Sequence, residues 1–152
     1  MKGYYKDEEA TNAAIEDGWY HTGDLGYVDD DGFIMLTGRK KNLIILSNGE
    51  NLSPEELEED IARDPQVREV LVYDEDGKIT AEIYPEEEYF DNYEYFNELK
   101  EKINNKRPMF KRIANVKLRK EEFIKNASMK IVRYLNIPSM QNNAQSSDTA
   151  NK

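Results

Sequence analysis

The stretch Gly18–Glu58 constrains the fold most, because it contains two β-type runs joined by a strong turn signal. The runs Tyr20–Asp24 and Phe33–Thr37 are rich in aromatic and β-branched residues, and Asp29-Asp30-Asp31-Gly32 lies between them. Runs of this kind on either side of a glycine-containing turn are typical of an antiparallel hairpin. The sequence therefore predicts a hairpin in the first third of the chain.

The two ends of this hairpin carry polar clusters of opposite character, Thr22-Gly23-Asp24 and Arg39-Lys40-Lys41. A carboxylate is the usual acceptor for ribose hydroxyls. An arginine offers fixed donors to hydroxyls or phosphate. A hairpin brings Asp24 and Arg39 into one neighbourhood, where they form either a nucleotide contact or an exposed salt bridge worth about 0–1 kcal/mol.

The rest of the chain predicts a second, helix-containing unit. Ser53-Pro54-Glu55-Glu56 combines a serine N-cap, a proline at the first helical position and acids in the first turn. Leu57 and Ile61 follow four residues apart, on one face of that helix. Val67–Tyr73 and Ile79–Tyr84 flank a glycine-containing turn, which predicts a second hairpin.

A further helix is expected from about Asn92, and a short strand at Val116–Arg119. The helix is indicated by apolar residues at helical spacing, namely Tyr89, Tyr93, Phe96, Leu99 (or Lys100) and Ile103. Such a stripe is more often the core face of a helix than a ligand groove. The predicted fold class is α+β, a small domain with a mostly antiparallel sheet of about three strands flanked by helices, preceded by the hairpin.

Composition and charge exclude several functions. The chain has 152 residues, with 31 acidic against 21 basic side chains and a net charge of -10, which argues against a nucleic-acid binder. There is no cysteine, so neither a disulfide framework nor a thiolate nucleophile is available. His21 is the only histidine and is a poor candidate for a metal ligand. No apolar run reaches membrane-spanning length, and we predict a soluble, cytoplasmic protein without a metal site of its own.

Four motifs follow one another along the chain, and they are listed here in order: Tyr20-His21-Thr22-Gly23-Asp24-Leu25; Gly38-Arg39-Lys40-Lys41; Gly49-Glu50-Asn51-Leu52-Ser53-Pro54-Glu55-Glu56-Leu57-Glu58; Phe123-Ile124-Lys125-Asn126-Ala127-Ser128-Met129-Lys130-Ile131. Together they resemble the motifs of the acyl-adenylate-forming (AMP-forming) ligases, the acyl-CoA synthetases above all, and most closely the long-chain fatty acid branch. Four motifs in the family's order form a specific signal, whereas any one of them alone is weak.

The resemblance implies a domain organisation. Residues 1–38 would be the tail end of the adenylate-forming N-terminal domain, 39–41 the hinge with Lys41 at the pivot, 42–137 the mobile C-terminal domain, and 138–152 a disordered tail. The family's phosphate-binding loop and acyl-binding pocket have no counterpart in this sequence. We therefore expect the missing N-terminal domain of the same protein as a partner and an isolated chain that is inactive.

The resemblance also implies site residues. Lys130 would be the adenylating lysine on a mobile loop, whose ammonium stabilises the charge that grows on phosphate oxygens; the alternative is a solvated surface lysine. Many family members have glycine at the position of Met129, whereas long-chain-type members tolerate a bulky residue there. Asp24 would contact the ribose hydroxyls and Arg39 the ribose or phosphate.

Two further assignments are weaker. Tyr20 is equally well interpreted as a residue beside the adenine or as a core strand residue. In the family, the loop that contains Gly49 approaches coenzyme A, and glycine permits such an approach. The sequence alone favours an ordinary Asn-Gly turn at Gly49.

The implied reaction has two half-reactions. ATP, Mg²⁺ and a small-molecule carboxylic acid, with fatty acids favoured, give an acyl-adenylate, and Lys130 and the metal ion stabilise the charge. The small domain then rotates about Lys41, and coenzyme A takes the acyl group. Two alternatives stay open. The acyl group could pass to an acyl carrier protein, or the chain could be a non-catalytic binding module derived from the family.

Overall fold

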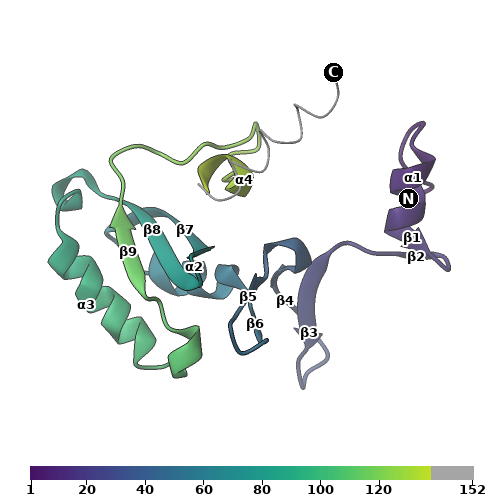
Figure 1. The fold of residues 1–152 in the computed structure, drawn as a ribbon. Helices are drawn as coiled ribbons and strands as arrows, with labels where there is room; N and C mark the ends of the chain where they lie inside the picture. The colour runs from purple at the N-terminus through teal and green to yellow at the C-terminus, as the bar shows by residue number, and fades with distance from the viewer. Residues whose placement is uncertain (138–152) are drawn as a thin grey trace. The chain divides into compact units, whose positions relative to one another are not determined.

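A computed structural model of the chain describes residues 1–137, which form parts of two compact units, Met1–Leu43 and a larger unit that begins at Ile44 (Figure 1). The division falls just after the predicted hinge, residues 39–41. The tail predicted for residues 138–152 lies outside the described residues.

The first helix of the smaller unit is α1, Glu8–Ala14, which has two acidic residues in its first turn. The Asp7 carboxylate accepts a hydrogen bond from the backbone N–H of Ala10 at 2.9 Å and caps this helix. Strands β1, Ile15–Glu16, and β2, Trp19–Tyr20, then form a short antiparallel pair in which Tyr20 lies opposite Ile15.

Strands β3, Asp24–Val28, and β4, Ile34–Arg39, form the predicted antiparallel hairpin. Its first strand was predicted at Tyr20–Asp24, and that range is wrong. Gly23 has a left-handed φ of +74°, so the chain turns between Tyr20 and Asp24 and the strand begins only after it. The tip is held by Asp29, whose carboxylate accepts the backbone N–H of Phe33 at 2.8 Å.

The larger unit contains a three-stranded sheet in the order β7-β8-β9. Its strands are β7, Val67–Glu75, β8, Lys78–Pro85, and β9, Asn115–Leu118. β7 and β8 are antiparallel, joined by a tight turn, whereas β9 runs parallel to β8. A parallel neighbour requires a crossover connection, and here a helix supplies it. The predicted α+β class with a sheet of about three strands is confirmed.

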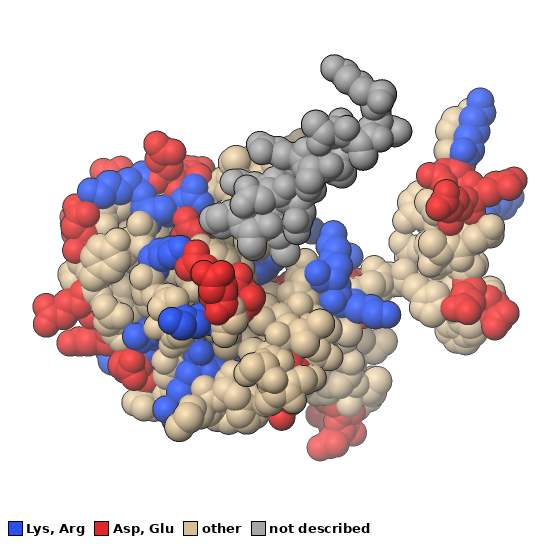
Figure 2. All heavy atoms as spheres, in the orientation of Figure 1, with Lys and Arg blue, Asp and Glu red and all other residues tan. Residues whose placement is uncertain are grey.

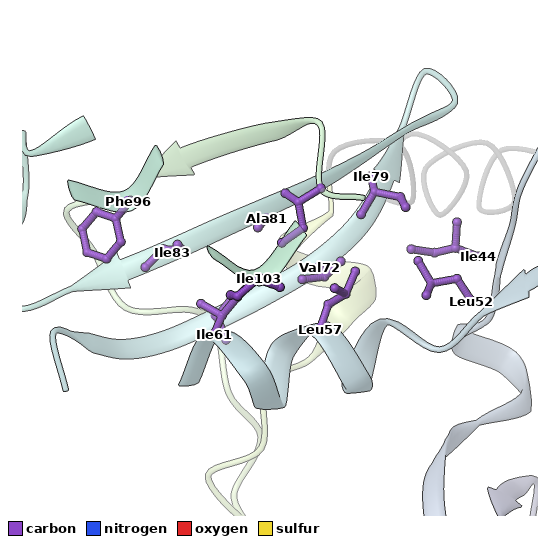
Figure 3. Packing of buried hydrophobic residues seen from close by; sticks show 12 residues of the cluster. Ile44, Leu52, Leu57, Ile61, Val72, Ile79, Ala81, Ile83, Phe96 and Ile103 are labelled. Carbon is purple, nitrogen blue, oxygen red and sulfur yellow. The ribbon is translucent and has the colours of Figure 1, made fainter. Parts of the chain in front are cut away.

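Two helices cover one face of this sheet, α2, Pro54–Ala62, and α3, Tyr93–Asn104. Figure 3 shows core side chains of α2, Leu57 and Ile61, lying against the sheet, and Phe96 and Ile103 of α3 belong to the same cluster. Leu57 and Ile61 of α2 are both buried, as their spacing predicted. Each fully buried aliphatic side chain contributes about 1.5–3 kcal/mol, so this core is the main source of the unit's stability.

The opposite face of the sheet is covered by the C-terminal segment, which ends in the one-turn helix α4, Arg133–Asn136. Side chains alternate along β7, so Val70 and Val72 face the helices while Leu71 and Tyr73 pack with Phe123 of this segment. The sheet is therefore the middle layer of the larger unit.

The remaining elements are short. Strands β5, Ile44–Ile45, and β6, Asn51–Leu52, pair on either side of a turn, and three 3₁₀ turns occur at η1, Lys40–Asn42, η2, Glu87–Tyr89, and η3, Met109–Lys111. On the face that Figure 2 shows, acidic and basic side chains are intermixed over the larger unit. Within residues 1–137, no helix is both long enough and apolar enough to cross a membrane.

Candidate functional site

The segment around Lys130 forms a small backbone-bonded loop. The N–H of Val132 donates to the carbonyl of Ile124 at 2.9 Å, Lys125 and Ile131 form an antiparallel bridge, and the N–H of Asn126 donates to the carbonyl of Lys130 at 2.9 Å. Three successive cross-links of this kind make the segment a short hairpin-like arm. We call residues 124–132 the lysine arm, and Lys130 lies just after its tip.

The tip of the lysine arm is organised by Asn126. Its side-chain oxygen accepts the backbone N–H of Ser128 at 3.0 Å and that of Lys130 at 3.0 Å. Its carbonyl accepts the N–H of Met129 at 2.9 Å. Met129 has a φ of +59°, the left-handed conformation that glycine adopts readily and other residues rarely adopt.

The base of the lysine arm is fixed to the core by Asn136. The Asn136 side chain is buried, accepts the N–H of Ile124 at 2.9 Å, and donates to the carbonyls of Ile124 at 3.0 Å and Val132 at 2.8 Å. Because both backbone groups of Ile124 are bonded to one buried amide, the base of the arm cannot shift without breaking the contacts of α4.

An ion pair on the other side of the arm adds a second anchor. Lys125 bonds to Glu69 of β7, and Lys125 Nζ lies 2.8 Å from Glu122 Oε2. Glu69 also accepts the N–H of Phe123 at 3.0 Å. The hydrogen bond that Lys125 donates to Glu122 raises the pKa of Lys125, so this lysine stays charged and bound.

The ammonium of Lys130, by contrast, is exposed, and within residues 1–137 it has no ion pair or side-chain hydrogen bond. Two lysines five residues apart therefore differ in their contacts: Lys125 holds the arm to the sheet, whereas Lys130 has no such partner among the described residues. An accessible, unpaired ammonium on a fixed backbone can stabilise negative charge on a bound ligand.

In the smaller unit, Asp24 and Arg39 lie directly opposite each other in the register of β3 and β4. Arg39 Nε is 2.7 Å from Asp24 Oδ1, and the guanidinium also reaches the carbonyl of Thr22 at 3.5 Å. The hairpin therefore brings the two predicted nucleotide-binding residues together, as its register requires. Asp24 is about a quarter exposed and Arg39 about half exposed, so both are accessible to a ligand.

The other predicted site residues lie in separate places. Tyr20 belongs to the β1–β2 pair, and its hydrogen bond with Tyr4 raises the pKa of Tyr4. Lys41 is exposed in the 3₁₀ turn that precedes the division between the units. Gly49 has a left-handed φ of +81° in the β5–β6 turn, and among the described residues no atom other than those of Gly49 and its two chain neighbours lies within 4 Å of where its side chain would begin.

Two residues that hold the arm, Asn126 and Asn136, were not predicted as functional from the sequence. Asn126 offered a signal, since asparagine side chains commonly bond to backbone N–H groups a few residues ahead in turns. Asn136 offered none, because its partners are fixed only by the tertiary fold. Among the described residues, no group of three or more His, Cys, Asp or Glu side chains is arranged to hold a metal ion.

Comparison with known proteins gives partial but consistent matches. The chain is 44% identical over 72 residues to a long-chain-fatty-acid–CoA ligase of Mycobacterium tuberculosis, covering 47% of this chain and 12% of the relative. It is 52% identical over 71 residues to a 2-succinylbenzoate–CoA ligase of Bacillus cytotoxicus, covering 47% of this chain and 15% of the relative. The chain thus spans less than a fifth of the length of these relatives. No family model matches it.

Solved structures match over most of the chain. An o-succinylbenzoate coenzyme A synthetase from Bacillus subtilis, in complex with AMP, aligns with a TM-score of 0.73 and 31% identity over 88% of this chain and 27% of that one. A fatty acyl CoA synthetase of Mycobacterium tuberculosis aligns with a TM-score of 0.57 and 31% identity over 87% of this chain and 26% of that one.

Proposed function

We propose, since the chain corresponds in sequence and fold to the C-terminal part of AMP-forming acyl-CoA ligases, that it supplies the adenylating lysine of such a ligase. The whole enzyme would join a carboxylic acid to coenzyme A at the expense of ATP. The names of the two relatives give different acids, a long-chain fatty acid and 2-succinylbenzoate. The similarity therefore supports ligation of an acid to coenzyme A, but it does not select one acid.

The observation that carries the proposal is the exposed ammonium of Lys130 on an anchored arm. In adenylation, a carboxylate oxygen attacks the α-phosphorus of ATP, and pyrophosphate leaves. Negative charge grows on the phosphate oxygens during this step, and a positioned cation lowers its energy. Lys130 has the charge, the exposure and the fixed backbone that this role requires.

Asp24 and Arg39 would hold the nucleotide. The Asp24 carboxylate accepts hydrogen bonds from the ribose hydroxyls, and Arg39 donates to ribose or phosphate oxygens. Their ion pair at 2.7 Å keeps the two side chains aligned and close, and both retain exposed atoms for a ligand. Tyr20 would pack beside the adenine.

Coenzyme A would react in the second half-reaction. The larger unit turns about Lys41, Lys130 leaves the reaction centre, and the thiol of coenzyme A takes the acyl group with release of AMP. Hinge residues need only absorb backbone rotation, and the exposed 3₁₀ turn at Lys41 suits that task. The open turn at Gly49 leaves space for the pantetheine arm.

An N-terminal domain of the same protein would complete the site. On the β3–β4 hairpin, large apolar side chains are exposed, namely Tyr27, Val28, Phe33, Ile34 and Leu36. A contiguous run of exposed apolar residues marks a surface that another part of a protein covers. The described residues offer no cluster of metal ligands, so we assign Mg²⁺ to no residue of this chain.

We favour a fatty acid as the substrate, because one of the similar proteins is a long-chain-fatty-acid–CoA ligase, and the cytoplasm as the location. A carrier protein is the second candidate acceptor, supported by the exposed turn η3, where Met109 and Phe110 lie beside Lys111 and Arg112. An apolar pair beside two cations is suited to an acidic carrier domain. A non-catalytic binding module is the third candidate.

ATP–pyrophosphate exchange by the full-length protein, measured across carboxylic acids of increasing chain length, tests the proposal. We expect exchange with at least one series of acids, and thioester formation when coenzyme A is added. Exchange without a coenzyme A thioester would favour the carrier protein. No exchange with any acid would contradict ligase activity and favour the binding module.

A further inference from the structure

The tip of the lysine arm is held in a backbone conformation that its own sequence does not prefer. Met129 has a φ of +59°, although it has a side chain and glycine would adopt this conformation more easily. Met129 is also 72% exposed, so packing of its side chain does not hold the backbone there. Some other interaction must fix the tip.

Asn126 supplies that interaction. Its side-chain oxygen accepts two N–H groups, from Ser128 and from Lys130, each at 3.0 Å. These two bonds lie on either side of Met129. They tie the backbone of Lys130 to a residue four positions earlier, and the base of the arm is in turn fixed by Asn136.

Asn126 is exposed and belongs to neither hydrophobic core. Its removal would therefore leave no cavity and would cost the fold little, unlike removal of the buried Asn136. The two side-chain hydrogen bonds of Asn126 fix the backbone conformation of the tip, and this conformation sets the position of Lys130.

We propose that Asn126 is a positioning residue, which sets the backbone of Lys130 so that its ammonium reaches the reacting phosphate in the adenylation step. The inference rests on the proposed function and deepens it. The ammonium of a lysine is carried by a flexible four-carbon side chain, so the position of the lysine backbone determines which positions the ammonium can reach. A misplacement of about 1 Å at a reacting centre lowers rates by roughly 100-fold.

Hydrogen exchange of the chain tests the geometry without any enzyme assay. Asn126→Ala should raise the exchange rates of the Ser128 and Lys130 amides at least about tenfold, because both N–H groups lose their acceptor. Asn126→Asp keeps an acceptor oxygen and should retain the protection. Unchanged rates in Asn126→Ala would overturn the proposal.

Kinetics of the full-length protein test the consequence. In Asn126→Ala, we expect kcat for ATP–pyrophosphate exchange to fall about 10- to 100-fold, with the KM for ATP changed less than about twofold. Transfer of the acyl group from preformed acyl-adenylate to coenzyme A should be unchanged, and Asn126→Asp should restore most of the exchange. Asn97→Ala, which removes an exposed asparagine of α3, is the matched control.

Three results would overturn the proposal: exchange by Asn126→Ala within about twofold of the wild type, equal losses in both half-reactions, or no recovery in Asn126→Asp. A wild-type protein that exchanges with no acid would instead contradict the proposed function. In that case the hydrogen-exchange result still decides whether Asn126 fixes the tip.

Discussion

Arg133 Nη1 lies 2.7 Å from Glu58 Oε1, and the two residues meet at the free edge of β7. The same Glu58 oxygen accepts the N–H of Val72 at 2.7 Å, and Arg133 donates to the carbonyl of Val72. The two side chains satisfy backbone groups that a neighbouring strand would otherwise bond. They also tie helix α2 to the segment that follows the lysine arm.

Breaking this pair should destabilise the fold strongly. In Arg133→Met, the Glu58 carboxylate stays buried without its counter-charge, and we expect the free energy of unfolding to fall by about 3–5 kcal/mol. Glu58→Gln should lower the free energy of unfolding less, because the amide oxygen can still accept hydrogen bonds from the Val72 N–H and from Arg133. Urea unfolding followed by circular dichroism measures both.

The double variant Glu58→Leu/Arg133→Met is the control for this interpretation. It removes both charges but leaves the N–H and the carbonyl of Val72 without these partners, so we expect a residual loss of about 1–3 kcal/mol. A double variant as stable as the wild type would show that the hydrogen bonds to the backbone of Val72 contribute nothing to stability. Arg133→Met within about 1 kcal/mol of the wild type would contradict the burial argument.

Stability should also depend on pH through Glu58. Burial raises the pKa of Glu58 above the ordinary value of 4.5, although Arg133 opposes the shift. The folded state therefore binds this proton more tightly than the unfolded state. The stability that the folded protein gains by binding the proton of Glu58 is fully present below pH 4.5 and is lost as the pH rises through the folded-state pKa of Glu58.

This sign can be checked by comparing the wild type with Glu58→Gln. The free energy of unfolding of the wild type should rise relative to that of the variant as the pH is lowered toward 4.5. The opposite trend would mean that the ion pair outweighs the desolvation of the carboxylate.

Met129 should respond to substitution according to its left-handed backbone. Met129→Gly removes backbone strain, which should stabilise the folded state by roughly 1–2 kcal/mol. Glycine also gives the unfolded chain more conformational entropy, which should lower the free energy of unfolding by about 0.4–1 kcal/mol. We expect a variant that is as stable as the wild type or slightly more stable. Met129→Ile, which places a β-branched side chain at positive φ, should be less stable than Met129→Gly by at least about 1 kcal/mol. The reverse order in thermal unfolding would contradict the assigned conformation.

The nucleotide role of Asp24 and Arg39 makes a different prediction. Their ion pair is partly exposed, so Asp24→Asn should change the free energy of unfolding by less than about 1 kcal/mol. It should raise the KM for ATP in the full-length protein about tenfold, because a charge-assisted hydrogen bond to ribose is weakened. Glu59→Gln, which breaks an exposed ion pair in α2, is the control. Equal KM values for the two variants would favour a merely structural salt bridge at Asp24.

Local signals in the sequence were sufficient for much of the fold. Pro54 begins α2, and the four-residue spacing of Leu57 and Ile61 identified its buried face. Ser53 occupies the predicted N-cap, but its hydroxyl donates to Glu55 at 2.8 Å instead of capping the helix. The resemblance to AMP-forming acyl-CoA ligases, inferred from four motifs, is confirmed by the comparisons.

Long-range pairing could not be predicted in the same way. The strand β3 begins at Asp24 and not at Tyr20 as predicted, because Gly23 at positive φ interrupts the extended chain despite the β propensity of the residues around it. The parallel pairing of β9 depends on the crossover through α3. The supports of the lysine arm, Glu58 with Arg133 and Asn136 with Ile124, join residues whose contact arises only from tertiary packing.

The central claim is that Lys130 acts in adenylation, and ATP–pyrophosphate exchange by full-length Lys130→Ala tests it most directly. Lys120→Ala is the matched control, since Lys120 is an exposed lysine of the same segment, 2.9 Å from Asp91. We predict that Lys130→Ala loses exchange by roughly 100- to 1,000-fold while Lys120→Ala retains it. Exchange by Lys130→Ala at the wild-type rate would contradict the account and assign the charge stabilisation to another residue.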